Sequence, residues 1–145
     1  MGQSEIDVDD LDATAALAGD VVELTVPGNT GFLGVVRTAT AGLAARLGFS
    51  LDEIEDLRIA VDEACLMVLN LPGPADPDDA LLTCRFQVSD QALTVTVSAR
   101  VGESASLPAE QSFAWRVLTA HVTSLSRRAG PGRATIELVK RRRQP

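Results

Sequence analysis

The segment between residues 49 and 70 constrains the fold more than any other, because a complete helix start signal precedes a long apolar pattern. Ser50 and Glu53 have the spacing of a capping box, in which each side chain satisfies a backbone N–H at the helix start. The acidic residues of the first two turns lie where the helix dipole is positive. We therefore predict a helix that begins at Leu51.

The apolar residues of this helix recur at helical spacing, which is typical of a core-facing stripe. They are Ile54, Leu57, Val61, Cys65 and Val68. Apolar residues also occur on the opposite face from Ile59 onward, so we expect the helix to be covered on both sides. Glu63 stands among them, and a carboxylate is costly to bury without a ligand or a hydrogen-bond partner. Glu63 is therefore a candidate functional residue; the alternative is that it reaches solvent past the helix edge.

The remaining patterns predict further strands and helices. We expect strands at Val21–Val26, Leu81–Val88, Ala92–Ala99, Leu125–Arg127 and Ala134–Lys140, and helices at Thr30–Leu47 and Phe113–Thr123. The first of these helices has an apolar stripe of Phe32, Val35, Val36, Ala39, Leu43 and Leu47, and the second has one of Phe113, Trp115, Leu118 and Val122. This order predicts an α+β fold, a two-layer sandwich of one mostly antiparallel sheet with helices on one face. The chain has no Gly-x-Gly-x-x-Gly or Walker A loop.

A chain of 145 residues with 46% hydrophobic content is the size of one domain. We expect a flexible acidic leader at residues 1–19, the domain at 20–141 and a basic tail at 142–145. The run Lys140–Arg143 lacks interleaved aromatic residues, so we interpret it as solvated and expect no direct contact with nucleic acid. There is no secretory signal and no apolar run of about 20 residues. We therefore expect a cytoplasmic protein that does not contact the membrane.

The net charge of −7 is unevenly distributed along the chain. Residues 1–80 contain 16 acidic and 3 basic residues, a net charge of −13, whereas residues 81–145 contain 4 and 10, a net charge of +6. An acidic face could complement a basic partner such as a DNA-binding protein; the alternative is an ordinary solvated surface. Cys65 and Cys84 lack zinc-binding spacing, so we expect buried, reduced thiols and no metal site. The lone His121 has no nucleophile beside it in a known motif.

The run Leu-Arg-Ile-Ala-Val-Asp-Glu-Ala-Cys at residues 57–65 resembles the N-box helix of the RsbW-type anti-sigma factors, ATP-binding proteins of the GHKL class. The segment Ser-Phe-Ala-Trp-Arg-Val-Leu-Thr-Ala at residues 112–120 is similar to one in mycobacterial members of that family. The likeness covers most of the chain and implies the GHKL fold. It also implies three partners: an alternative, stress-response sigma factor, a STAS-type anti-anti-sigma protein, and a second copy of the chain in a homodimer.

Arg37 lies off the apolar stripe of its helix, which by pattern alone is typical of a solubilising arginine. RsbW-type proteins carry an arginine 26 residues before the N-box glutamate, and Arg37 and Glu63 have that separation. In the family this arginine belongs to the surface that holds the sigma factor and its antagonist. The resemblance therefore makes Arg37 a candidate partner contact.

The family's nucleotide motifs are retained only in part. Glu63 matches the N-box glutamate, but Met67 replaces the magnesium-binding asparagine, and a thioether is a poor ligand for that ion. Residues 98–103, where the Asp-x-Gly-x-Gly motif is expected, lack the adenine-binding aspartate and retain at most Gly102. Ser112–Trp115 replaces Gly-x-Gly-Leu. The resemblance leaves Glu63 as the catalytic candidate, and Glu63 and Gly102 as cofactor contacts, with ATP and magnesium bound weakly or not at all.

Two functions of different class follow. The first is a binding protein, an anti-sigma factor that sequesters a sigma factor and is released by an anti-anti-sigma partner. The second is an ATP-dependent serine kinase that phosphorylates that antagonist. We favour the first, because phosphoryl transfer requires magnesium and phosphate contacts that the altered motifs weaken. A third reading is an inert relative of histidine-kinase ATPase domains.

Overall fold

A computed structural model describes residues 19–143. Most of the expected leader, residues 1–18, and the last two residues of the expected tail lie outside the described residues. In chain order the elements are β1 (Val21–Pro27), the 3-10 turn η1 (Thr30–Phe32), α2 (Leu33–Arg46), α3 (Leu51–Leu69), η2 (Pro77–Asp79), β2 (Leu81–Val88), β3 (Ala92–Arg100), α4 (Phe113–His121), β4 (Ser124–Gly130) and β5 (Arg133–Arg141).

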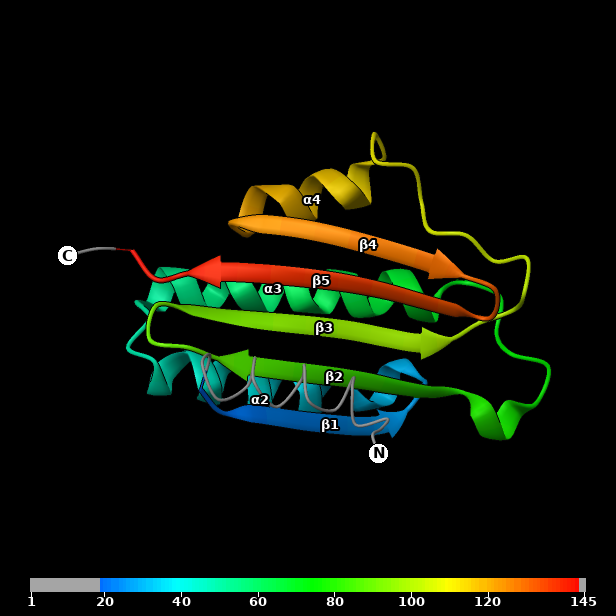
Figure 1. Ribbon diagram of the computed structural model, residues 1–145, viewed down its shortest axis with the longest axis horizontal. Coiled ribbons are helices and arrows are strands. Elements are labelled where there is room, and N and C mark those ends of the chain that lie inside the picture. The colour runs from blue at the N-terminus through cyan, green and yellow to red at the C-terminus, as the bar shows by residue number, and fades with distance from the viewer. Residues whose placement is uncertain (1–18, 144–145) are drawn as a thin grey trace, which may run out of the picture.

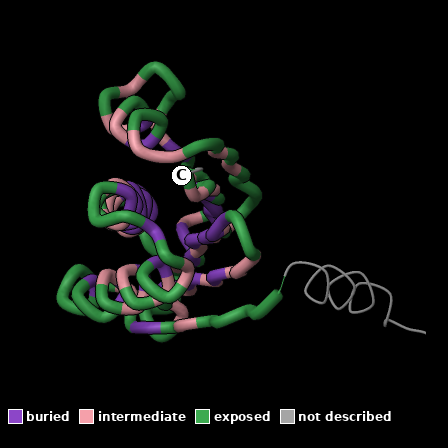
Figure 2. Tube along the Cα trace, turned by 90° about the vertical axis from the view of Figure 1, so that its left-hand side faces the viewer, coloured by how far each residue is buried: buried purple, intermediate pink, exposed green. Residues whose placement is uncertain are grey.

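The five strands form one sheet in the order β1-β2-β3-β5-β4, and every neighbouring pair is antiparallel. The helices α2, α3 and α4 lie on one face of this sheet, as the side view in Figure 2 shows. In Figure 1 the strands lie in front of α2 and α3, so the viewer looks onto the other face of the sheet. The predicted two-layer α+β sandwich is confirmed.

Alternation along the strands places apolar side chains under the helices. On β2 these are Leu82, Cys84 and Phe86, and on β3 they are Leu93, Val95 and Val97; all six are fully buried. Most residues that alternate with them are polar and point to the uncovered face of the sheet. Both strands lie where the sequence predicts them.

Helix α3 begins as predicted. The Ser50 hydroxyl accepts a hydrogen bond from the Glu53 backbone N–H at 3.1 Å, and a Glu53 carboxylate oxygen accepts one from the Ser50 N–H at 2.8 Å. The stripe predicted for this helix is buried against the sheet at Leu57, Val61, Cys65 and Val68. The expectation of cover on both sides is wrong at Ile59, which is 37% exposed, but it holds from residue 60 to residue 69, where every residue is buried or half-buried.

The predicted stripe of the first helix is correct in part: it packs against the core at Val36, Ala39, Leu43 and Leu47, whereas its first two members are exposed. Phe32 is 39% exposed and Val35 is 49% exposed. Because residues 30–32 form a 3-10 turn capped by Asn29, the α-helical repeat begins only at Leu33. The buried side chains of α2 are Leu33, Val36, Thr40 and Ala44. Thr40 is tolerated in the core because its hydroxyl donates a 2.8 Å hydrogen bond to the carbonyl of Val36.

Two smaller expectations about α4 also need correction. Phe113, expected on its buried stripe, is 76% exposed, whereas Trp115 and Leu118 are buried. The helix ends at His121 because Val122 has the extended backbone that leads into β4. Within the described part of the chain, no helix is long and apolar enough to cross a membrane.

Candidate functional site

Arg37 lies on α2 where that helix packs beside α3. Its Nε atom donates a 2.9 Å hydrogen bond to Oδ1 of Asp62, forming an ion pair between the two helices. The side chains of Arg37 and Asp62 are 42% and 30% exposed, so the pair is reachable from solvent. Arg37, which was expected to be exposed, is therefore only half-exposed. A carboxylate of the helix layer, which consists of α2, α3 and α4, holds its guanidinium in place.

The sequence analysis did not single out Asp62 as the partner of Arg37. A usable signal was present, because both residues lie off the buried stripes of neighbouring helices and carry opposite charges. The choice of partner depends on the packing of α2 against α3, since α3 carries five other carboxylates between residues 52 and 63. The structure places Arg37 beside the residue that precedes Glu63.

Glu63 lies on the outer side of α3 and is half-buried. Within the described residues, its carboxylate makes no hydrogen bond or ion pair. Both readings of Glu63, a functional carboxylate and a residue that reaches solvent at the helix edge, stay predictions. Met67, one turn later, is 4% exposed and belongs to the core. Position 67 is thus covered by the rest of the protein, whereas Glu63, one turn earlier on the same side of the helix, is half-buried.

Gly102 lies in the loop after β3 and packs against another loop. Its N–H donates a 2.7 Å hydrogen bond to the carbonyl of Pro72. A Cβ atom at this position would lie 3.2 Å from the carbonyl oxygen of Gly73, which is tighter than an ordinary contact. This close approach of two backbones gives a structural reason for glycine at position 102 that requires no ligand.

The loop between β3 and α4 is held against the core. Val101 and Leu107 are buried, and the guanidinium of Arg127 donates a hydrogen bond to the carbonyl of Pro108. The same guanidinium lies 5.0 Å from the ring centre of Trp115, within the range of a cation–π contact. The indole that replaces the family leucine therefore helps to fix the loop.

Ser112 caps the helix that follows this loop. Its hydroxyl accepts a 3.2 Å hydrogen bond from the Trp115 backbone N–H. One of the N–H groups that a glycine-rich loop would present to a phosphate is thus satisfied by a side chain of the protein. Phe113, beside this cap, presents an aromatic ring to solvent.

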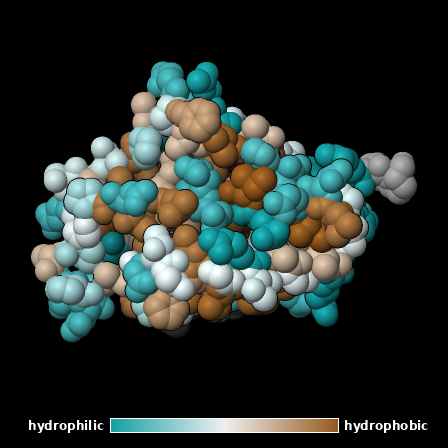
Figure 3. Space-filling view, turned by 180° about the vertical axis from the view of Figure 1, so that it is seen from behind, coloured by the Kyte–Doolittle hydropathy of each residue, from teal (hydrophilic) through white to brown (hydrophobic). Residues whose placement is uncertain are grey.

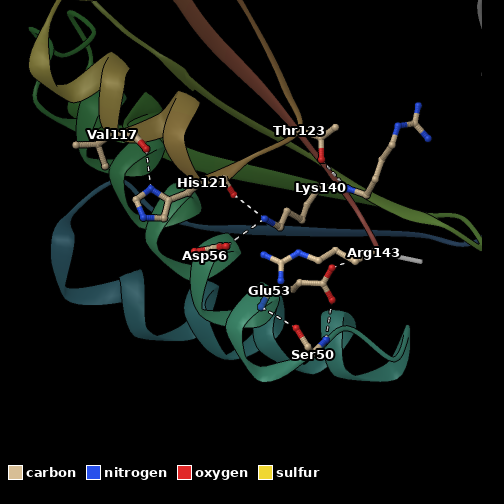
Figure 4. Close-up of polar contacts among 9 residues, drawn as sticks. Ser50, Glu53, Asp56, Val117, His121, Thr123, Lys140 and Arg143 are labelled. Carbon is tan, nitrogen blue, oxygen red and sulfur yellow. Dashed lines mark hydrogen bonds and ion pairs between the residues drawn. The ribbon is translucent and has the colours of Figure 1, made fainter. Parts of the chain in front are cut away.

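A polar cluster joins the start of α3, the end of α4 and the C-terminal strand (Figure 4). Lys140 Nζ lies 3.3 Å from Oδ2 of Asp56 and donates a 3.1 Å hydrogen bond to the carbonyl of His121. Lys140 is only 8% exposed, so the expectation of a solvated basic run is wrong for this residue. Strand alternation explains the difference, because position 140 falls on the face of β5 that is covered by helices.

Glu53 anchors the two residues that follow β5. It is 2% exposed, and its Oε2 accepts a 2.7 Å hydrogen bond from the Arg143 backbone N–H. Burial raises the pKa of Glu53, but the hydrogen bonds from Ser50 and Arg143 and the charge of Arg143 outweigh it and hold the pKa below its usual value. Arg142 donates to the carbonyl of Leu47. The start of the expected tail is thus attached to the helix layer.

The two cysteines are buried free thiols, as the sequence analysis predicted. Cys65 on α3 contacts Cys84 on β2, and this thiol contact together with burial raises the pKa of Cys65. A thiol held neutral and away from solvent is a poor nucleophile. These cysteines are therefore part of the packing between helix and sheet.

Part of the chain is similar in sequence to proteins named RsbW. No family model matches the chain. The chain is 35% identical over 81 residues to the serine-protein kinase RsbW of Bacillus licheniformis and 37% identical over 79 residues to that of Bacillus subtilis. These matches cover 56% and 54% of this chain and 50% and 49% of the relatives, so the chain spans about half the length of the curated relatives it matches.

A solved structure shares the fold. The RsbU and RsbW domains of Rv1364c from Mycobacterium tuberculosis match with a TM-score of 0.70 at 17% identity, over 88% of this chain and 34% of that one. The α+β fold with one antiparallel sheet is therefore that of a structure containing an RsbW domain. The chain is a homologue, at modest identity, of proteins named RsbW serine-protein kinases.

Proposed function

We propose that the protein is an anti-sigma factor, which binds and sequesters an alternative sigma factor through its helix layer. The observation that carries this proposal is the position of Arg37, half-exposed on α2 and oriented by Asp62 on α3. An arginine whose guanidinium is already fixed loses less conformational freedom on binding, and such residues are frequent at the centre of protein interfaces. The partner-contact role of Arg37 stays a prediction that the geometry supports.

The helix layer also has the composition of a protein-binding surface. Figure 3 views this side of the molecule and shows hydrophobic areas among hydrophilic ones. Its exposed large apolar residues include Val35, Ile59 and Phe113. Its helices carry six carboxylates and four arginines, an excess of negative charge that suits a basic partner, as a DNA-binding sigma factor would be. Release by a STAS-type anti-anti-sigma protein belongs to the same proposal.

The proposal extends to the class of anti-sigma factor and to the oligomeric state. From the resemblance of residues 61–63 and 112–120 we propose a role of the same class as that of the mycobacterial anti-sigma factor UsfX. We also propose a homodimer. The edge strand β1 and helix α2 border a groove lined by Leu24, Val35 and Ala39, with exposed Val22 and Phe32 nearby, where a second copy could pack.

The alternative function is a serine kinase that phosphorylates the antagonist. Two observations favour it: the curated relatives are named serine-protein kinases, and the carboxylate of Glu63 is engaged by no described residue. Against it stand the buried Met67, the packing of Gly102 against the Pro72–Gly73 loop, and the Ser112 cap. We propose that ATP and magnesium are bound weakly or not at all, and that partner binding does not require them.

The test is a charge reversal on α2 with a matched control. The partner is first identified by co-purification from the native cell and mass spectrometry, and its affinity is then measured by calorimetry. Arg37→Glu should weaken binding by about 100-fold, the size of effect that a central interface arginine commonly has. Arg46→Glu changes an exposed arginine of the same helix and should leave affinity within about threefold. Unchanged affinity in Arg37→Glu would refute the proposed site.

A further inference from the structure

The uncovered face of the sheet is a separate surface with its own chemistry. Every second residue of the strands points to it, and no described helix lies on it (Figure 1). Five arginines point to this open face, against two glutamates. The arginines are Arg85, Arg100, Arg128, Arg133 and Arg141, and the glutamates are Glu23 and Glu137. The face is therefore basic.

The other residues of the open face are small and polar. They are mainly Thr25, Thr83, Thr94, Thr96, Ser98, Thr135, Ser124 and Ser126. No aromatic residue of the described strands points to it, so it lacks the stacking platforms with which sheet surfaces bind single-stranded nucleic acid. A flat surface of arginines among short hydroxyl side chains fits an acidic polypeptide, whose carboxylates pair with guanidinium groups.

The chain itself carries such a polypeptide before β1. Residues 1–18 contain Glu5, Asp7, Asp9, Asp10 and Asp12 and no lysine or arginine. The segment joins the sheet at its edge strand, because the carbonyl of Asp20 accepts a 2.8 Å hydrogen bond from the N–H of Val88 at the end of β2. The chain thus leads from this segment into the sheet at the end where Arg141 pairs with Ala92.

The length of residues 1–18 and their covalent attachment before β1 both permit an intramolecular contact with the open face. Eighteen residues span up to about 60 Å when extended, whereas five strands are about 20 Å wide. A short tether raises the effective concentration of the segment at the face to the millimolar range, so several weak ion pairs suffice for substantial occupancy. An unattached acidic peptide would have to reach that concentration in solution.

We propose that the acidic segment 1–18 docks on the open face of its own sheet, with its carboxylates against the arginines of β2, β5 and β4. In the docked state the basic face is neutralised within the chain. The acidic helix layer is then the charged surface left open to other proteins. This inference is independent of the sigma-factor proposal.

Paramagnetic relaxation in the full chain tests the docking. A nitroxide is attached at Ser4→Cys; the native cysteines are fully buried and do not compete for the label. The reference is the same labelled chain with Asp7, Asp9, Asp10 and Asp12 changed to Asn. We expect the amide signals of Arg128 and Arg141 to be reduced at least about twofold relative to that reference, because the docked state is substantially populated. Raising the salt to about 1 M, where the screening length is about 3 Å, should remove the difference.

Charge reversals identify the surface. Arg128→Glu, at an exposed position of β4, should reduce the broadening at Arg141, whereas Arg46→Glu on α2 should not. Equal broadening in the neutralised reference would overturn the proposal, as would broadening concentrated on the helix layer. A mixture of labelled chains with isotope-enriched unlabelled chains shows whether the segment reaches a second copy; broadening of the same size in that mixture would overturn the intramolecular contact.

Discussion

The helix layer and the open face of the sheet differ in net charge and in how their charged groups are paired. The helices α2, α3 and α4 carry six carboxylates and four arginines, whereas the open face carries five arginines and two glutamates. The two faces of the sandwich thus carry excess charge of opposite sign. A chain with this division can present one sign of charge to a partner while the other is directed away from it.

The two faces also differ in how their charged groups are paired. In the helix layer, Asp62 pairs with Arg37, Asp56 with Lys140, and Glu53 with the backbone of Arg143. On the open face, the ion pair of Arg100 with Asp79, at 3.5 Å, is the one found among the described residues. More charged groups of the helix layer are therefore held in fixed positions by a partner, which is why we place partner recognition there.

The largest expected effect concerns nucleotide. Mg-ATP should bind at millimolar or weaker affinity in calorimetry, because two lost contacts of about 1.5 to 3 kcal/mol each move a micromolar site into that range. Met67→Asn should not restore binding, since position 67 is buried. Micromolar binding by the unmodified chain, or phosphate transfer to an anti-anti-sigma serine that Glu63→Ala abolishes, would instead support the kinase function.

A core substitution sharpens the contrast between the two sides of the sheet. Leu57→Ala in α3 should lower the free energy of unfolding by about 2 to 5 kcal/mol, because this fully buried side chain lies between helix and sheet. Thr96→Ala on the open face should change it by about 0.5 kcal/mol or less. Chemical denaturation measures both values. Similar losses in the two variants would show that the open face is as tightly packed as the helix side.

Glu53 should make stability depend on pH. Its pKa is lower in the folded protein than the ordinary value of 4.5, so its contribution is complete above that value and is lost as the pH falls through the folded pKa. Glu53→Gln should cost about 1 to 3 kcal/mol at neutral pH and flatten the acid side of the stability curve. Denaturation between pH 7 and pH 3 provides the comparison, with Glu55→Gln, an exposed neighbour, as the control. An unchanged acid slope in Glu53→Gln would contradict the assignment.

The smallest effect is expected for Arg37 itself. Arg37→Ala should change the free energy of unfolding by about 0.5 kcal/mol or less, because a half-exposed ion pair contributes little to stability. Its affinity for the partner should fall strongly in the same variant. A thermal or chemical denaturation series separates the two effects, and a loss of stability above about 2 kcal/mol would mean that Arg37 acts in folding.

The sequence predicted much of this fold because its strongest signals are local. The Ser50–Glu53 cap and the alternation of β2 and β3 depend on short spacings, and the structure reproduces them. The stripe of α2 was extended too far toward the N-terminus, because residues 30–32 form a 3-10 turn that leaves Phe32 outside the α-helix, and no residue type announces such a turn.

Interactions across the fold were harder to predict. The partner of Arg37, the burial of Lys140 and the backbone contact of Gly102 each join segments far apart in the chain. Residue type and spacing fix none of these pairings before the elements are packed. The candidate residues could thus be named from the sequence, whereas their surroundings required the structure.

The most direct test of the account maps the partner onto the two faces. Amide chemical shifts of the isotope-enriched protein are compared with and without the unlabelled sigma factor that co-purifies with it, in the absence of Mg-ATP. We expect the shifts to concentrate on α2 and α3 around Arg37 and Asp62, with the outward residues of β2, β3 and β5 little changed. Shifts confined to the open face of the sheet, with α2 and α3 unaffected, would contradict the placement of recognition on the helix layer.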